Sequence, residues 1–167
     1  MTTTQIASKL HLTDLTLLTG RLLLSLLFVH EGLELATHFE GAAKAVATLG
    51  VSLPLLMATI VLQLGAGLSV GLGLLTRLGA VCLGLFCVAT AALFHTNFAS
   101  QNELLHFEKD LAIAGGMFVL AIAGGGAISF DGMLTGLVKR RQQDKETVAA
   151  LIAAGSPLSA GDIKLPF

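Results

Sequence analysis

The residues best suited to chemistry are histidines and carboxylates that gather near the ends of long apolar runs. One group lies at the end of the first run and consists of His30, Glu31, Glu34 and His38. At about 100° per residue, these four side chains share one face of a helix. Ionisable groups inside an apolar span are costly and normally face the protein interior or a water-filled cavity. The spacing therefore predicts a polar site on one side of the first helix.

Further polar residues stand beside later apolar runs and could meet this face. The third run is followed by His95 and Asn97, and the fourth is preceded by His106 and Asp110. The second run contains one amide, Gln63, nearer to its middle. Helices of a bundle bring such positions together at one depth. The candidate polar site therefore consists of His30, Glu31, Glu34, His38, Gln63, His95, Asn97, His106 and Asp110.

Several chemistries fit this combination of residue types. Histidines beside carboxylates can relay protons, hydrogen-bond the oxygens of a quinone head group, or bind a transition metal such as copper or zinc. His30 and His38 lie about 12 Å apart along a helix axis, so one ion cannot bind both. A metal site would need ligands from two helices, and its candidates are Glu34, His38, His95 and His106. Alternatively, these groups only satisfy one another where the helices emerge into water.

Four apolar stretches must position these residues. A helix needs about 20 mainly apolar residues to cross about 30 Å of hydrocarbon, and the ranges 15–36, 53–75, 78–94 and 111–130 qualify. Only 13% of the residues are charged and 54% are hydrophobic, whereas about a quarter of the residues in soluble domains are charged. The sequence predicts an all-α integral membrane four-helix bundle, in which small residues such as Gly67 allow close helix packing.

The distribution of basic residues predicts the orientation. With four crossings the two termini share one side of the membrane, and eight of the ten Lys and Arg residues lie on that side. The positive-inside rule therefore places both termini in the cytoplasm. Arg21 lies inside the first span and would have to snorkel back to the membrane surface. We assign roles in structure and topology to Arg21, Arg77, Lys139, Arg140 and Arg141.

The chain divides into a membrane domain, residues 1–132, and a basic cytoplasmic tail, residues 133–167, which is expected to be partly helical. The basic run of the tail favours contact with anionic lipid headgroups. Membrane lipid is thus one partner, and a protein partner or a second copy of the chain is another. A net charge of -1 makes nucleic acid a poor candidate partner.

The sequence lacks the motifs of a self-contained redox enzyme. It has no GxGxxG motif after a strand and no cysteine redox pair, since Cys82 and Cys87 are five residues apart in an apolar run. Any electron transfer must therefore use a diffusible cofactor or another subunit. Neither a catalytic residue nor a complete enzyme can be assigned from the visible motifs.

Three segments, taken in order, carry a family resemblance. They are GRLLLSLLFVHEGLEL, LQLGAGLSVGLGLLTRLGAVCLGLFCVATAALFHTNF and HFEKDLAIAGGMFVLAIAGGGAISFDG. Together they resemble the DoxX family of small four-span bacterial membrane proteins, over roughly residues 19–132. The resemblance implies a four-helix bundle in the bacterial inner membrane. It also implies family-like residues at Arg21, Gly32, Arg77, His95, Asn97, Asp110 and Asp131.

The resemblance has two departures and one functional implication. Relatives commonly have Lys at the position of Glu34 and Glu at the position of Gln63. DoxX-like proteins are similar to the small membrane subunit of a thiosulfate:quinone oxidoreductase, and relatives are linked to oxidative-stress complexes and to copper-responsive peptide clusters. The resemblance therefore favours an accessory redox component associated with a quinone or an oxidoreductase. The alternatives are a non-enzymatic scaffold or partner subunit and a protein that handles copper or zinc.

Overall fold

The described part of the chain is entirely helical. The computed structural model describes residues 3–95 and 97–153, and the side chains of residues 12–95 and 97–150. The predicted all-α class is confirmed for these residues. The helices run in the order α1 (Thr3–Thr37), α2 (Phe39–Thr48), α3 (Leu53–Leu72), α4 (Thr76–Phe94), α5 (Gln101–Ala123) and α6 (Phe130–Ala153).

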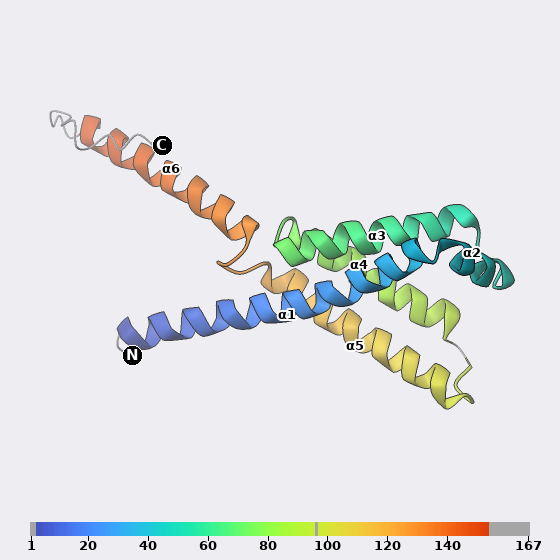
Figure 1. Ribbon diagram of the computed structural model, residues 1–167. Helices are drawn as coiled ribbons and strands as arrows, with labels where there is room; N and C mark the ends of the chain where they lie inside the picture. Colours follow the sequence, from blue (N-terminus) through green and yellow to red (C-terminus); the bar gives the residue numbers. More distant parts are fainter. Residues whose placement is uncertain (1–2, 96, 154–167) are drawn as a thin grey trace.

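The helices α1, α3, α4 and α5 pack against one another, and α6 extends away from them (Figure 1). α1 packs against α3, α3 against α4, and α4 against α5, while α1 also crosses α5. The buried core between them centres on Phe28, Val70, Leu83 and Met117. Within the part of the chain that the structure describes, three helical segments are long and apolar enough to cross a membrane, namely Leu12–Thr37, Leu53–Leu72 and Thr76–Phe94.

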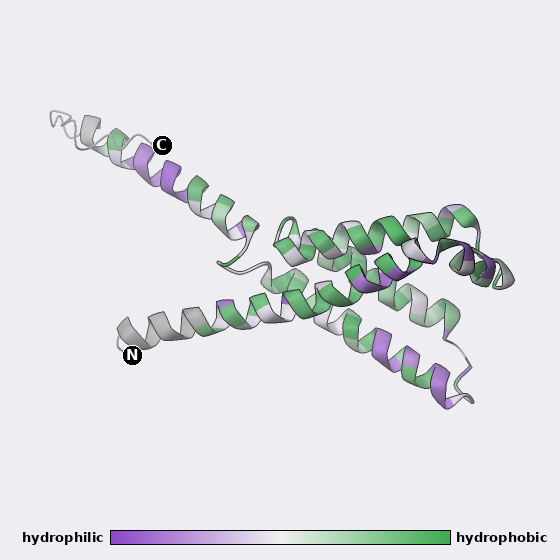
Figure 2. Cartoon of the chain, in the orientation of Figure 1, coloured by the Kyte–Doolittle hydropathy of each residue, from purple (hydrophilic) through white to green (hydrophobic). Residues whose placement is uncertain are grey.

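Apolar side chains also cover the outside of the packed helices. Figure 2 shows hydrophobic residues along α3 and α4, and hydrophilic residues in the first half of α5 and the middle of α6. Leu23, for example, is 64% exposed and Leu85 is 57% exposed. A helix that is apolar on its outward face as well as its inward face is suited to a lipid surrounding. These outward side chains are suited to contact with membrane lipid.

Glycine allows α1 and α3 to approach closely. The hydroxyl of Ser25 donates a 2.7 Å hydrogen bond to the carbonyl of Gly67. A Cβ atom at Gly67 would lie 3.1 Å from Val29 Cγ2 and 3.3 Å from Phe28 Cβ. Small residues at such crossings are what membrane helices use to bring their backbones together. The predicted role of Gly67 in helix packing agrees with this contact.

A tight turn joins α3 to α4. α3 ends at Leu72, and Gly73 follows with a φ of 74°. Leu75, with a φ of 50°, directly precedes the first residue of α4. A glycine just after a helix is favoured because it reaches the left-handed region without steric strain. The short connection between the second and third apolar runs therefore places α3 and α4 against each other as an antiparallel pair.

The structure differs from the sequence prediction at two connections. The polar segment between the first two predicted spans contains an additional helix, α2, Phe39–Thr48. The fourth apolar run, predicted to be helical over 111–130, forms a helix only as far as Ala123. Gly124 and Gly126 have φ values of 80° and 75°, which only glycine adopts readily. The predicted range therefore extends beyond the end of α5, and α6 is a separate helix.

Candidate functional site

A cavity of about 390 Å³ lies between α1, α3, α4 and α5, and we call it the polar pocket. Ligand pockets are typically about 300–1,000 Å³, so its size suits a small organic group. Aromatic and aliphatic side chains share its wall with amide, imidazole, hydroxyl and carboxyl groups. Its lining is Leu27, Phe28, Glu31, Gln63, Phe86, Cys87, Thr90, Phe94, His95, His106, Lys109, Asp110 and Ile113.

His95 connects two carboxylates at this pocket. Its Nδ1 lies 2.9 Å from Glu103 Oε2, and its Nε2 lies 4.0 Å from Asp110 Oδ2. The ring also stacks on that of His106, with 5.3 Å between the centroids and 21° between the planes. The side chain of Asp110 is 15% exposed and that of Glu103 is 33% exposed. The three groups form a row that runs from the more exposed Glu103 to Asp110 in the pocket.

A hydroxyl and an amide complete the polar wall. Thr90 Oγ1 lies 3.1 Å from Asp110 Oδ2 and also within hydrogen-bond distance of two carbonyls of its own helix. Gln63 is only 5% exposed, and its Oε1 has no hydrogen-bond partner among the described residues. A buried acceptor without a partner costs about 1–3 kcal/mol. The unpaired oxygen of Gln63 is therefore the feature that most needs an explanation.

The predicted polar face of the first helix is divided between two environments. Glu31 lines the polar pocket, whereas His30 is exposed outside it. Glu34 and His38 pair with each other at 3.2 Å, with side chains 63% and 71% exposed. Asn97 is also exposed and is absent from the lining. The predicted site residues that the pocket brings together are Glu31, Gln63, His95, His106 and Asp110.

The candidate metal ligands are separated by this division. Glu34 and His38 form their exposed pair on α1 and at its end, whereas His95 and His106 stack at the polar pocket. Among the described residues, no group of three or more His, Cys, Asp or Glu side chains is arranged to hold a metal ion. This donor set does not fit a copper or zinc centre, so we derive no chemistry through one.

Several residues in the polar pocket or bonded to its lining were not singled out from the sequence. Glu103 is the most informative, because it bonds to His95 directly. A helical signal for it exists, since Glu103, His106 and Asp110 follow the i, i+3, i+7 spacing of one helix face. Thr90 and Cys87 had no comparable signal, because a hydroxyl or thiol in an apolar helix most often only packs or bonds its own backbone.

A second, apolar cavity of about 320 Å³ adjoins the polar pocket, and we call it the apolar groove. The two cavities share the side chains of Phe86, Thr90 and Phe94. The rest of the groove is almost entirely aliphatic and comes from α1, the α2 region, α3 and α4. These residues are Leu35, Val46, Val51, Leu55, Leu56, Ala58, Thr59, Leu62, Ala89 and Leu93.

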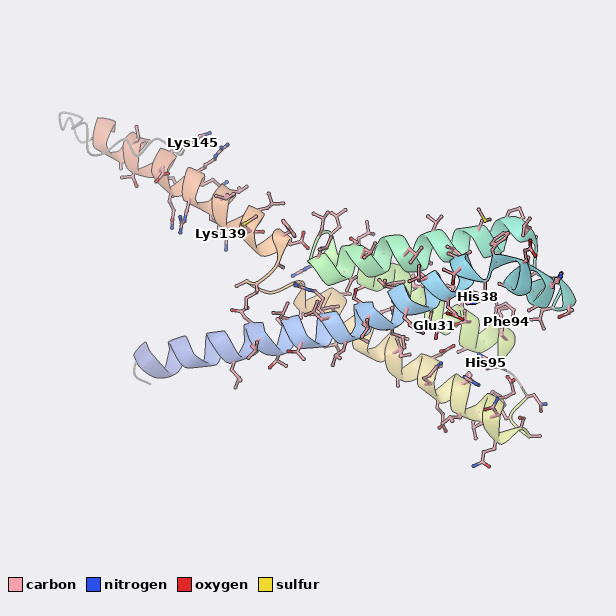
Figure 3. The ribbon with its side chains drawn as sticks, in the orientation of Figure 1. Glu31, His38, Phe94, His95, Lys139 and Lys145 are labelled. Atoms are coloured by element: carbon pink, nitrogen blue, oxygen red, sulfur yellow. The ribbon has the colours of Figure 1, made fainter. Side chains whose placement is uncertain are left out.

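Figure 3 shows the candidate site residues and the basic residues of α6 at opposite ends of the molecule. Glu31, His38 and His95 lie at the end near α2, whereas Lys139 and Lys145 lie on α6. The side chains of Arg77, Arg140 and Arg141 are exposed. None of these basic residues lines the polar pocket.

Arg21 is placed differently from the sequence expectation. It does not snorkel to a surface but is 3% exposed. Its Nη1 donates a 2.6 Å hydrogen bond to the carbonyl of Gly125, and its Nη2 donates a 3.0 Å bond to that of Ile128. Carbonyls that the glycine-rich loop leaves outside a helix are available as acceptors. Arg21 therefore pairs with backbone oxygens inside the protein instead of with lipid headgroups.

Asp131 secures the other side of the same loop. Its two carboxylate oxygens accept 2.9 Å hydrogen bonds from the backbone N–H groups of Leu75 and Thr76. Burial by itself raises the pKa of this carboxyl, but the bonds from Thr76 and Leu75 and the charge of Arg21 outweigh it. The pKa of Asp131 is therefore held below its ordinary value. The carboxylate ties the first turn of α6 to the start of α4.

Comparisons with known proteins agree with this helical membrane architecture. The DoxX family model matches residues 16–96. The inner membrane protein YqjF of Escherichia coli K12 is 39% identical over 123 residues, which cover 74% of this chain and 95% of that protein. The chain belongs to the DoxX family. The inner membrane protein YphA of the same organism is 34% identical over 122 residues, or 69% of this chain and 87% of YphA.

Membership in the DoxX family confirms the predicted resemblance and the location. Both relatives are named as inner membrane proteins, and the chain has three apolar helices of spanning length in its described part. It is a multi-pass inner membrane protein. The family match begins within α1, includes α2, α3 and α4, and ends at residue 96. No solved structure matches the chain.

Proposed function

We propose that this DoxX-family protein is an accessory, redox-associated membrane component that binds the head group of a quinone in the polar pocket. The observation that carries the proposal is the buried amide of Gln63, whose Oε1 lacks a partner among the described residues. It shares the pocket with Asp110 and His95. The hydroxyl of a reduced quinone head group would donate the hydrogen bond that this buried acceptor needs, whereas a carbonyl oxygen could only accept one from a donor group of the pocket.

The shape of the site supports a ligand with a polar ring and an apolar tail. Phe28, Phe86 and Phe94 supply flat apolar surface beside the polar groups of the pocket. The apolar groove shares Phe86 and Phe94 and offers an aliphatic wall for an isoprenoid tail. A site of this kind, mostly apolar with a few fixed polar groups, is typical of small-molecule binding. Quinones combine these two features within the membrane.

The row of Glu103, His95 and Asp110 is suited to moving protons. A quinone carries electrons and protons between enzymes. Histidine is the side chain whose charge changes near neutral pH, and both of its ring nitrogens here face carboxylates. In the proposed role, Asp110 exchanges a proton in the pocket and His95 passes it to the more exposed Glu103. The electrons belong to a partner oxidoreductase, for which this chain acts as an accessory subunit.

We further propose four crossings, with α5 as the fourth and both termini in the cytoplasm. The apolar part of α5 begins only after Asp110, and the helix ends at Ala123. Asp110 itself faces the polar pocket rather than lipid. An inward carboxylate is tolerated in a crossing when it faces other polar groups of the bundle. This arrangement puts the polar pocket toward the periplasmic side and α6 at the cytoplasmic surface.

Photolabelling with an azido-quinone in native membranes tests the binding site. We expect crosslinks in peptides from the pocket segments of α3, α4 and α5, and we expect an unlabelled short-chain quinone to compete for them. Gln63→Leu removes the amide and is expected to reduce the labelling strongly. The matched control is Glu34→Gln, which changes an exposed residue outside the pocket and is expected to leave the labelling unchanged.

Labelling that does not change with Gln63→Leu, or that maps only to the lipid-facing sides of the helices, would overturn the quinone proposal. The alternative function, a non-enzymatic scaffold or partner subunit, would then be favoured. It has one structural observation in its support, because His95 already bonds to Glu103 and Thr90 to Asp110 without any ligand.

A further inference from the structure

A larger cavity, of about 710 Å³, lies at the opposite end of the molecule, and we call it the basic cavity. The start of α4, the glycine-rich loop and the first half of α6 enclose it. Its two cationic lining residues are Arg77 and Lys139. Apolar side chains on α4 and α6 form much of the remaining wall, notably Leu75, Leu78 and Leu134. None of these residues belongs to the polar pocket.

The charges at this cavity are unbalanced. Within the described part of the chain, all ion pairs involve histidine, so neither Arg77 nor Lys139 is paired with a carboxylate. Asp131 is the one acidic residue of the lining, and the N–H groups of Leu75 and Thr76 already bond to its two oxygens. The cavity therefore presents two free cations and an anion whose oxygens are occupied.

The side chain of Arg77 lies beside the glycine-rich loop at this cavity. A Cβ atom at Gly124 would lie 3.2 Å from Arg77 Nε, so the guanidinium rests against bare backbone. Guanidinium groups bind phosphate oxygens through two parallel N–H donors. Lys139 lies across the cavity on α6 and adds a second charge. An anionic phosphate fits between these two side chains by charge.

The exposed face of α6 places this cavity at a lipid surface. Phe130, Met133, Leu134, Leu137 and Val138 are between 47% and 57% exposed, and their spacing puts them on one side of the first turns of the helix. The basic residues Arg140 and Arg141 follow directly. An amphipathic helix with apolar residues beside a basic segment lies in the membrane interface. The apolar walls of the cavity then suit acyl chains rather than a free inorganic ion.

We propose that the basic cavity binds one anionic phospholipid, with its phosphate between Arg77 and Lys139 and the start of its acyl chains against Leu78 and Leu134. Basic pockets at the cytoplasmic side of membrane helices are known to suit lipid headgroups. The bound lipid would hold the first turns of α6 against the start of α4. This site is independent of quinone binding, since it shares no residue with the polar pocket.

The test uses the purified full-length chain in a neutral detergent at about 0.15 M salt, where charges outside the cavity are screened. Phosphatidylglycerol is titrated, and native mass spectrometry counts bound lipid. We expect one tightly bound molecule. Arg77→Gln with Lys139→Gln is expected to weaken its affinity about twenty-five-fold, from about fivefold for each basic side chain beside an anionic lipid. Lys139→Gln alone changes an exposed residue of α6 and gives a smaller loss without a risk to folding.

The control is Arg140→Gln with Arg141→Gln, which removes two charges of the same helix outside the cavity lining. We expect it to keep the affinity of the wild-type chain. Equal losses in the control and in the cavity variant would overturn the site, since they would indicate general attraction to the basic helix. Equal binding of phosphatidylcholine would also overturn it, as would competition by inorganic phosphate at the concentration of the lipid.

Discussion

Arg21 and Gly125 lie 104 residues apart in the sequence, and a 2.6 Å hydrogen bond from the guanidinium to the glycine carbonyl joins them. The same side chain donates to Ile128, so one arginine of α1 holds the loop between α5 and α6. Asp131 fixes the other side of this loop to the start of α4. The glycine-rich segment is thus part of the folded core and not a passive linker.

Replacing Arg21 by Leu is expected to destabilise the protein. The substitution leaves the carbonyls of Gly125 and Ile128 without the donors that they now have, and an orphaned buried acceptor costs about 1–3 kcal/mol. Thermal unfolding of the purified chain in detergent measures the loss. Arg21→Lys keeps the charge but not the two-armed donor geometry, so it should be intermediate. An Arg21→Leu chain as stable as the wild type would contradict this role.

The lowered pKa of Asp131 predicts a stability change at acidic pH. The ordinary value of such a carboxyl is 3.8, and the folded protein holds the pKa below it. The stabilisation is therefore fully present above the ordinary value and is lost as the pH falls through the folded pKa. Unfolding temperatures measured across the acidic range should fall, and Asp131→Asn should reduce that fall. The same pH dependence in both chains would show that another group is responsible.

Replacing Gln63 by Leu is expected to stabilise the protein while it removes a function. The change eliminates a buried oxygen without a partner, and such an oxygen costs about 1–3 kcal/mol. The unfolding temperature of the ligand-free chain should therefore rise, whereas quinone binding should be lost. Sites kept for binding commonly reduce stability in this way. A ligand-free Gln63→Leu chain that unfolds earlier than the wild type would indicate that the amide has a structural role instead.

Two glycines of α3 provide a matched test of helix packing. A Cβ atom at Gly67 would lie 3.1 Å from Val29, whereas at Gly65 it would meet nothing within 4 Å. Gly67→Ala should cost about 1–3 kcal/mol through overpacking. Gly65→Ala should instead be neutral or stabilising, because alanine favours a helix by about 1 kcal/mol over glycine. Unfolding in detergent compares the two, and equal effects would argue against a close α1–α3 contact at Gly67.

The proposed orientation can be tested by cysteine labelling in a chain from which Cys82 and Cys87 have been removed. Gly41 in α2 has open space around it, and Lys145 is an exposed residue of α6. A membrane-impermeant thiol reagent added to intact cells should modify Gly41→Cys and not Lys145→Cys until the membrane is opened. Labelling of Lys145→Cys from outside would reverse or break the four-crossing topology.

Hydropathy alone predicted the helices whose length and apolar composition suit a membrane crossing. The second and third spans agree closely with α3 and α4, because a helix in a membrane must be apolar over a fixed length. α2 was missed, since its ten residues are too short and too mixed to carry that signal. The end of α5 was missed because its apolar composition continues beyond Ala123, while the consecutive glycines determine where the helix stops.

The candidate site was predicted less completely, for a geometric reason. Helix periodicity placed His30, Glu31 and Glu34 on one broad face, but only packing against α4 and α5 decides that Glu31 alone lines the pocket. The role of Arg21 could not be anticipated either, because its acceptors are carbonyls of a loop that hydropathy had assigned to a helix. Contacts between helices depend on rotation, which a single sequence does not specify.

The most direct test of the central proposal is to measure the quinone that co-purifies with the protein from native membranes, by extraction and mass spectrometry, in matched variants. We predict near-stoichiometric quinone with the wild-type chain and with Glu34→Gln, whose residue is exposed and outside the pocket. We predict its loss with Gln63→Leu and a reduction with Asp110→Asn, since both residues line the polar pocket. Equal amounts of quinone in all four chains, or none in the wild type, would contradict the proposal.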